Sequence, residues 1–233
     1  MTVEEYKAHV AAAKRIVFFG GAGVSTESGI PDFRSVDGLY NQKYDVPPEV
    51  ILSSDYFYSH TDLFYKFYFD KMIFRSAMPN AAHKKLAQWE REGKLIAVIT
   101  QNIDGLHQAA GSKNVFELHG TTLSNHCIRC GKKYTLDEIC GHIPAVPKCD
   151  CGGIIKPDVV LYGEALPEDA VYGAVSAIGK ADMLIVGGTS LSVYPAAGFI
   201  GYFRGNKDNL IVINKTHIDG FPNQLNGKLG ELL

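Results

Sequence analysis

Short apolar runs alternate with helical patterns along most of this chain. The runs are rich in Val and Ile and occur at 16–19 (IVFF), 95–99 (LIAVI), 115–118 (VFEL), 159–162 (VVLY), 183–187 (MLIVG) and 210–214 (LIVIN). Strands buried on both faces of a parallel sheet have this character. Helical patterns span 80–91 and 168–180, and Thr2 with Glu5 offers a capping box for a first helix that runs to about Ala13. The alternation predicts an α/β fold, a Rossmann-like doubly wound parallel sheet.

Two segments interrupt the alternation. Residues 37–79 are aromatic and helical, and residues 123–157 contain all five cysteines. We expect these two insertions to build a smaller helical and metal-binding domain above the carboxyl edge of the sheet. The Rossmann-like nucleotide-binding domain would then comprise 1–36, 80–122 and 158–233, and the cleft between the two domains would hold the site.

Composition restricts the class of protein. The chain has 233 residues, is 46% hydrophobic and 21% charged, and carries a formal net charge of −2. This balance argues against a specific nucleic-acid binder, which would usually carry a strongly basic face. The start of the chain lacks a basic segment followed by an apolar core, and no apolar run approaches ~18 residues. We therefore expect neither a signal peptide nor a membrane span, and a cytoplasmic location.

Four of the cysteines form two close pairs. Cys127 and Cys130 are separated by two residues, and Cys149 and Cys151 by one, with polar, glycine-rich sequence around them. Structural zinc takes four tetrahedral ligands, so the two pairs predict one zinc site. Four thiolates leave no position for a catalytic water, which makes the predicted zinc structural. Cys140 lies outside both pairs and is interpreted as a half-buried thiol.

A glycine turn follows the first predicted strand. Gly21-Ala22-Gly23 would let backbone N–H groups approach a phosphate, with Ser25 and Thr26 as hydroxyl donors. The third glycine of the usual dinucleotide fingerprint is absent, because Thr26 stands there. No acidic residue ends the next strand, which closes on Thr100-Gln101-Asn102. A standard hydride-transfer enzyme is therefore disfavoured.

Seven motifs in a fixed order resemble the sirtuin family, in its bacterial type. They are GAGVSTESGIPDFRS (21–35), TQNIDGLH (100–107), LHG (118–120), the paired cysteines, YGEALP (162–167), GGTSLSVYPAA (187–197) and VIN (212–214). The resemblance covers almost the whole chain. It implies an NAD-dependent protein lysine deacetylase or deacylase that moves the acyl group from lysine to ADP-ribose and releases nicotinamide. The implied partners are proteins or peptides that contain acyl-lysine.

The resemblance also assigns roles to residues. His119 is the implied general base, and Asn102 is the second catalytic residue because it holds an ordered water beside the ribose. Residues of six segments would contact NAD: Ala22, Thr26, Phe33, Arg34, Gln101, Ile103, Asp104, His119, Thr189, Ser190, Asn214, Lys228 and Leu229. The acyl-lysine peptide would add as a strand beside Val160, Leu161, Tyr162 and Val193.

The residue types agree with the implied chemistry. Loss of nicotinamide leaves an electron-poor sugar carbon that the acyl oxygen captures only where water is excluded. Pro31 and Phe33 would supply apolar cover, so the tail of the glycine turn acts as a lid. An imidazole with a pKa near ~6.5 suits proton abstraction by His119 at neutral pH.

Alternatives of other classes remain at this stage. A mono-ADP-ribosyltransferase breaks the same bond and differs in its acceptor. A nucleic-acid module built on the cysteine pairs has few basic residues to support it, and a non-catalytic NAD sensor would not need His119. His107 and His126 are not required by the chemistry.

The helical insertion allows two predictions of acyl preference. Sirtuins that prefer succinyl or malonyl groups carry a Tyr-x-x-Arg pair there, and the nearest match here is Tyr68-x-x-Lys71. A register one residue earlier gives Phe67 and Asp70, which would repel a carboxylate. We expect acetyl and other uncharged acyl groups, with desuccinylase or demalonylase activity as the alternative.

Overall fold

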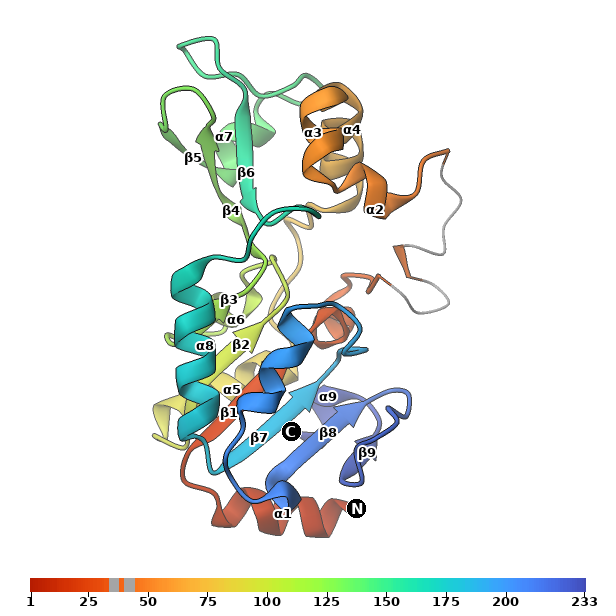
Figure 1. Cartoon of the computed structure of the whole chain (residues 1–233), viewed down its shortest axis with the longest axis vertical. Helices are drawn as coiled ribbons and strands as arrows, with labels where there is room; N and C mark the ends of the chain where they lie inside the picture. Colours follow the sequence, from red (N-terminus) through yellow and green to blue (C-terminus); the bar gives the residue numbers. More distant parts are fainter. Residues whose placement is uncertain (34–37, 40–44) are drawn as a thin grey trace.

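The computed structural model describes residues 1–33, 38–39 and 45–233. A parallel sheet forms the lower part of the molecule in Figure 1, in the strand order β3-β2-β1-β7-β8-β9. Its strands are β1 (Ile16–Gly20), β2 (Leu95–Thr100), β3 (Val115–Glu117), β7 (Met183–Gly187), β8 (Leu210–Asn214) and β9 (Gln224–Asn226). Every neighbouring pair is parallel. This order reverses between β1 and β7, which is where doubly wound folds bind nucleotides.

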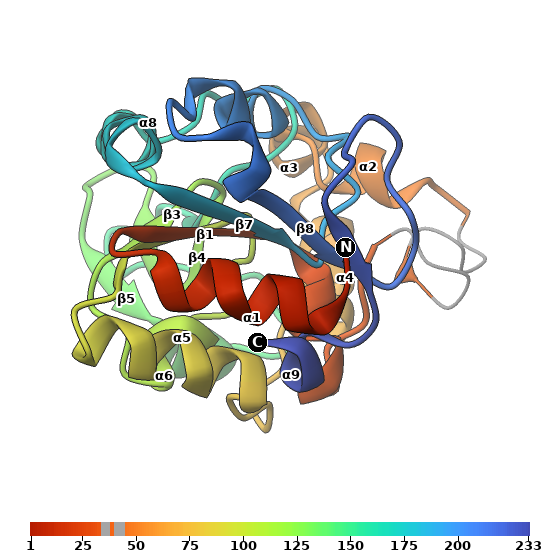
Figure 2. The same cartoon turned by 90° about the horizontal axis from the view of Figure 1, so that it is seen from below.

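Helices cover both faces of this sheet. Seen from below in Figure 2, α1 (Val3–Ala12), α5 (Ala81–Arg91), α6 (Leu106–Ala109) and α9 (Leu229–Leu232) lie on one face, and α8 (Glu168–Lys180) lies on the other. Side chains of β1 alternate between the two cores: Ile16 and Phe18 face the first group, while Val17 and Phe19 face α8 and the 3-10 helix η4 (Ala196–Tyr202). All five residues of β1 are buried, and burial of both faces of the strand explains its uninterrupted apolar run.

A second layer stands above the carboxyl ends of the strands. It contains the antiparallel sheet β5-β4-β6 and four helices around one aromatic core. These elements are α2 (Pro48–Ile51), α3 (Ser54–Ser59), α4 (Thr61–Lys71), β4 (Gly120–Cys127), β5 (Lys133–Thr135), α7 (Leu136–Cys140) and β6 (Ile155–Val159). Phe57, Phe64, Tyr65 and Tyr68 are fully or almost fully buried in this core. The aromatic run of α4 therefore belongs to the core of this second layer, which is called the small module below.

Most predicted elements are confirmed. Helices α5 and α8 occupy the two predicted helical stretches, and α1 begins with the predicted capping box of Thr2 and Glu5. The prediction for 159–162 was wrong. The strand there is β6, which ends at Val159 and pairs antiparallel with β4 in the small sheet. The apolar run lines the cavity between the two layers, so apolar character does not place it in the parallel sheet.

Three further 3-10 turns complete the described chain. They are η1 (Ala22–Val24), η2 (Thr26–Ser28) and η5 (Lys207–Asn209). Among the helices that the structure describes, none combines the length and the apolar character that a membrane crossing requires.

Candidate active site

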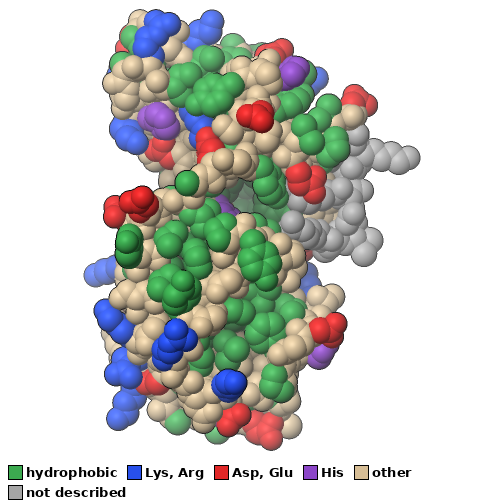
Figure 3. Space-filling model, viewed as in Figure 1, with side chains coloured by type: hydrophobic (Ala, Val, Ile, Leu, Met, Phe, Trp, Pro, Cys, Tyr) green, Lys and Arg blue, Asp and Glu red, His purple; other side chains and the backbone are tan. Residues whose placement is uncertain are grey.

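A cavity of about 1080 Å³ lies between the two layers. Figure 3 shows the surface hollowed at this level, with hydrophobic side chains around the hollow. Its wall is contributed by the turns after β1, β2 and β7, by the segment after β6, and by α4 and α7. The carboxyl ends of the parallel strands thus form the floor, as expected for an open α/β sheet.

The turns after β1 and β7 press against each other at the floor. The N–H of Gly23 donates a 2.8 Å hydrogen bond to the carbonyl of Gly188. A Cβ on Gly23 would lie 2.7 Å from Cα of Gly188, and one on Gly188 would lie 2.5 Å from the nitrogen of Val24. Only glycine permits this approach, which leaves Gly21 and Ala22 lining the cavity at the switch point.

A chain of three polar side chains connects the β1 and β2 turns. The amide of Asn102 donates to Ser25 Oγ at 3.0 Å, and Ser25 Oγ donates to Asp104 Oδ2 at 2.6 Å. The other carboxylate oxygen of Asp104 accepts the N–H of Leu106 at 2.9 Å. Each member is therefore oriented by its neighbour. Asn102, Ile103 and Asp104 all line the cavity.

His119 follows β3 and lines the same cavity. Its Nδ1 lies 3.0 Å from the carbonyl oxygen of Gln101, which can only accept, so Nδ1 carries a proton and Nε2 is left as a proton acceptor. Burial lowers the pKa of His119, partly offset by that hydrogen bond. The imidazole is thus held neutral and in the tautomer of a general base.

The opposite end of the cavity lies above β7, β8 and α9. Residues predicted to contact adenosine line it: Thr189, Ser190, Asn214, Lys228 and Leu229. Gln101 links this end to the centre, because its side-chain amide donates to Thr189 Oγ1 at 3.1 Å. The sequence motifs at 187–197 and 212–214 are therefore brought together with that at 100–107.

The predicted peptide-binding residues Val160, Leu161, Tyr162 and Val193 also line the cavity. The N–H of Val160 donates to the carbonyl of His119 at 2.9 Å, which ties this segment to the candidate base. Tyr162 is 40% exposed, so the segment reaches solvent at the mouth of the cavity.

Three predicted NAD contacts have different placements. Phe33 lines the cavity and packs against the core of the small module, and Pro31 lines it as well. Thr26 is not part of the lining, and its hydroxyl donates to the carbonyl of Gly23 at 3.0 Å, within the turn. Arg34 lies outside the described residues.

The four predicted zinc ligands meet in one cluster. The sulfur atoms of Cys127, Cys130, Cys149 and Cys151 lie within 4.8 Å of one another. The separations are 3.5 Å for Cys127 and Cys151 and 3.6 Å for Cys130 and Cys149. Four sulfurs at ~2.3 Å from a tetrahedral zinc would be ~3.8 Å apart, so the cluster fits one zinc ion. Cys140 is half-buried and outside it.

Other residues of the wall were not predicted as site residues. Gly188 and Lys215 line the adenosine end, while Arg75 and Asp137 line the small-module side. Arg75 and Asp137 form an ion pair of 2.6 Å between the chain after α4 and helix α7. Their separation in sequence gives no signal of this pairing. The position of Lys215 directly after the VIN motif is a usable signal.

A sequence model of the Sir2 family matches residues 21–195. An NAD-dependent protein deacetylase of Clostridium acetobutylicum is 59% identical over 217 residues, which cover 92% of this chain and 88% of that protein. Its counterpart in Cutibacterium acnes is 48% identical over 92% of this chain. A solved structure of Sir2 with a p53 peptide and NAD⁺ is 39% identical, with a TM-score of 0.87, and covers 99% of this chain and 95% of that one. This chain belongs to the Sir2 family.

Proposed function

We propose that this protein is an NAD-dependent protein lysine deacetylase. It transfers the acetyl group of acetyl-lysine to the ADP-ribose part of NAD and releases nicotinamide. The relatives named above support this activity. The observation that carries it is His119, half-buried at the cavity with Nδ1 bound to the carbonyl of Gln101 and Nε2 available as a base.

NAD would lie along the floor of the cavity. The backbone around Ala22, with Arg34, would hold the phosphates and the nicotinamide ribose, and Thr26 would support this turn through its bond to the carbonyl of Gly23. Ile103 and Asp104 would surround the nicotinamide, and Thr189, Ser190, Asn214, Lys228 and Leu229 would hold the adenosine half. When bound, NAD supplies the ribose carbon that accepts the acyl oxygen as nicotinamide leaves.

The chain itself contributes three actions. His119 Nε2 would accept a proton from a ribose hydroxyl of bound NAD and so activate that hydroxyl toward the acyl carbon. Gln101 and Asn102 hold the ribose and an ordered water. Pro31 and Phe33 exclude bulk water from the reactive sugar.

The zinc has a structural role in this proposal. Four thiolates close the coordination shell, and the cluster lies at the far end of β4 from Gly120, which follows His119. It holds the loop after β4 and the loop before β6 together, at one end of the pair formed by these strands. That pair carries the peptide-binding segment 160–162.

Further assignments belong to the same proposal. The substrates are proteins or peptides with acyl-lysine, and no specific nucleic acid is bound, which the net charge of −2 supports. The Rossmann-like domain comprises 1–36, 80–122 and 158–233, and the small domain 37–79 and 123–157. A cytoplasmic location fits the set of free cysteines.

Desuccinylase or demalonylase activity is the second candidate. The observation that favours it is Lys71, which lines the small-module side of the cavity. Its ammonium lies 3.0 Å from Asp70, so part of its charge is already balanced. Acetyl-lysine therefore remains the preferred substrate.

The test is product analysis with NAD labelled in the ribose and an acetyl-lysine peptide. We expect free lysine peptide, nicotinamide, and label in a small O-acetyl ester. Label retained on protein would identify an ADP-ribosyltransferase. NAD binding without turnover would identify a sensor.

A further inference from the structure

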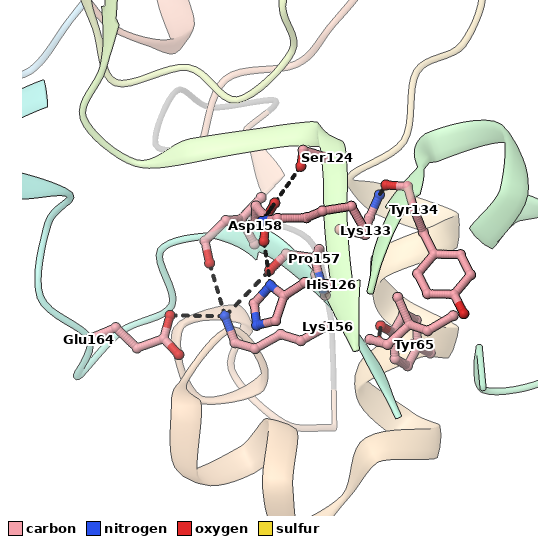
Figure 4. Close-up of polar contacts among 12 residues, drawn as sticks. Tyr65, Ser124, His126, Lys133, Tyr134, Lys156, Pro157, Asp158 and Glu164 are labelled. Carbon is pink, nitrogen blue, oxygen red and sulfur yellow. Dashed lines mark hydrogen bonds and ion pairs between the residues drawn. The ribbon is translucent and has the colours of Figure 1, made fainter. Parts of the chain in front are cut away.

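A buried lysine lies beneath the proposed peptide-binding segment. Lys156 on β6 has 8% of its side chain exposed, and its Nζ is 3.1 Å from Glu164 Oε2. The same nitrogen lies 3.2 Å from the carbonyl of Val159 and 3.4 Å from that of Pro157. Figure 4 draws its contacts with Pro157 and Glu164 as dashed lines. An ammonium has three protons, and three acceptors surround this one. Lysine is almost never buried without such partners, so this charge is fully engaged.

Glu164 links Lys156 to the segment that follows β6. The Oε2 atom that meets Lys156 also accepts the N–H of Leu161 at 2.9 Å. In return, the N–H of Glu164 donates to the carbonyl of Leu161 at 3.0 Å. The turn 161–164 is therefore closed twice, once through the backbone and once through a carboxylate that Lys156 holds.

Hydrogen bonds connect the turn 161–164 to the start of α3, and the residue before the turn to His119. The backbone N–H of Tyr162 donates to the carbonyl of Leu52 at 2.9 Å, and the carbonyl of Tyr162 accepts the N–H of Ser54 at 3.0 Å. These two bonds join the turn to the start of α3. Lys156 Nζ also lies 6.0 Å from the ring centroid of Phe57, on the same helix. At the other end, Val160 is bonded to His119. A shift of the turn would move the peptide edge relative to the base.

A second polar cluster on the same strands stays apart from this pair. Asp158 accepts from Ser124 and His126 and forms an ion pair of 3.3 Å with Lys133. The peptide units of Pro157 and Val159 contact Lys156, while the side chain of Asp158 between them contacts β4 and β5. The Lys156 pair is therefore the one directed at the segment 160–164.

We propose that Lys156 and Glu164 are positioning residues that fix the edge to which the acyl-lysine peptide adds. This inference rests on the proposed function. A peptide that binds as an added strand needs backbone partners at set spacing. If the segment 160–162 is not held in advance, the peptide must order it on binding, which lowers affinity for the peptide. NAD lies on the sheet side of the cavity, so its affinity should not change.

The test compares Lys156→Met and Glu164→Gln with the wild type, using full-length protein, an acetyl-lysine peptide and NAD. We expect KM for the peptide to rise about tenfold or more, as for loss of one partner of a buried pair. We expect kcat at saturating peptide, the Kd for NAD and the zinc content to stay near wild type. Lys66→Met is the matched control, because Lys66 is an exposed lysine on α4. It should leave KM unchanged.

Two more variants separate positioning from stability. Removing both charges in Lys156→Met/Glu164→Gln leaves no unpaired charge buried, so Tm should return toward wild type. KM for the peptide should stay high, whereas Lys156→Arg should lower it toward wild type. Wild-type KM in folded single variants would overturn the proposal. Recovery of KM together with Tm in the double variant would also overturn it.

Failure of the proposed function gives a different result. The wild-type protein would then leave the acetyl-lysine peptide unmodified. Peptide affinity is measured in parallel by fluorescence anisotropy, without turnover. Equal affinity of the wild type and the Lys156→Met variant would refute the positioning role independently.

Discussion

The hydroxyl of Ser25 lies 2.6 Å from Oδ2 of Asp104, and both side chains line the cavity. The serine also accepts the amide of Asn102 at 3.0 Å. It thereby orients one group proposed to bind nicotinamide and one proposed to hold the ribose and its water. Preorganised polar groups of this kind cost little reorganisation during the reaction.

Replacing Ser25 with alanine removes both hydrogen bonds. We expect kcat/KM for NAD to fall about 10- to 100-fold, equivalent to roughly 1.4–2.7 kcal/mol of transition-state stabilisation. Steady-state kinetics with varied NAD measures this. Ser59→Ala on α3 is the control, since its exposed hydroxyl contacts the carbonyl of Asp55 and Nδ1 of His60, and none of these residues lines the cavity. Equal losses in both variants would contradict a specific role.

Replacing His119 with alanine removes the proposed base. Turnover should fall roughly 100-fold or more while most NAD affinity remains. In the wild type, burial lowers the pKa of His119, so the active neutral form persists to lower pH. The acid limb of the kcat/KM profile, which reports groups of the free enzyme, should therefore have its midpoint below ~6.5. A midpoint above that value would argue against His119 as the titrating group.

Removing zinc should unfold the small module. We expect about one zinc per chain by metal analysis, and loss of both metal and activity on chelation or in Cys127→Ala/Cys130→Ala. Cys140→Ala is the matched control, because Cys140 lies outside the cluster and should leave the zinc content unchanged. Protein purified without chelator that contains no zinc would refute the site.

Two buried histidines should make stability fall in acid. Burial lowers the pKa of His83 to about 4 and that of His107 to about 3, and their rings lie 4.7 Å apart. Below pH ~6.5 both histidines are protonated in the unfolded chain but stay neutral in the folded chain. The free energy of unfolding therefore decreases as the pH falls, until the pH reaches the folded pKa values. Each histidine that is protonated only in the unfolded chain contributes about 1.4 kcal/mol per pH unit to the slope of the free energy of unfolding against pH.

The substitution His107→Leu should reduce that slope by about one proton. Denaturant unfolding at pH 7.5 and pH 5 measures it. His60→Leu, at an exposed position, serves as a control and should leave the slope near wild type. An unchanged slope in His107→Leu would assign the acid sensitivity to other groups.

Acyl preference is tested on one peptide that carries acetyl-, butyryl- or succinyl-lysine. We expect the highest kcat/KM for an uncharged acyl group, because a buried carboxylate needs a strong cationic partner to offset desolvation. A succinyl value clearly above the acetyl value, and lost in Lys71→Met, would establish the alternative. Lys66→Met controls for the loss of one positive charge on α4.

Much of the fold could be predicted because its signals are local. The strands at 16–20 and 183–187 are apolar on both faces, and α5 has an amphipathic pattern with a cap at Asn80. The cysteine spacing predicted a cluster that does form. The glycines after β1 also predicted a turn there, whereas the contact with Gly188 that permits only glycine at position 23 is visible only in the structure.

Other features depended on contacts between distant segments. The apolar run at 159–162 has the same character as the buried strands, yet it leaves β6 and lines the cavity, because β4 offers β6 an antiparallel edge. The short strand β9 has too few residues to show a period. Register and partner choice arise from pairing across the sheet, which a single segment does not encode.

The sequence by itself determined the alternation of strands and helices, the two cysteine pairs that form one cluster, and the family motifs with His119 among them. Only the tertiary structure decided which nitrogen of His119 is free, since the carbonyl of Gln101 that binds Nδ1 comes from another strand end. It also decided the burial of Lys156, which in sequence looks like a solvated charge. Its three acceptors meet only when the turn at 161–164 folds back over β6, because burial and hydrogen bonding are properties of the assembled chain.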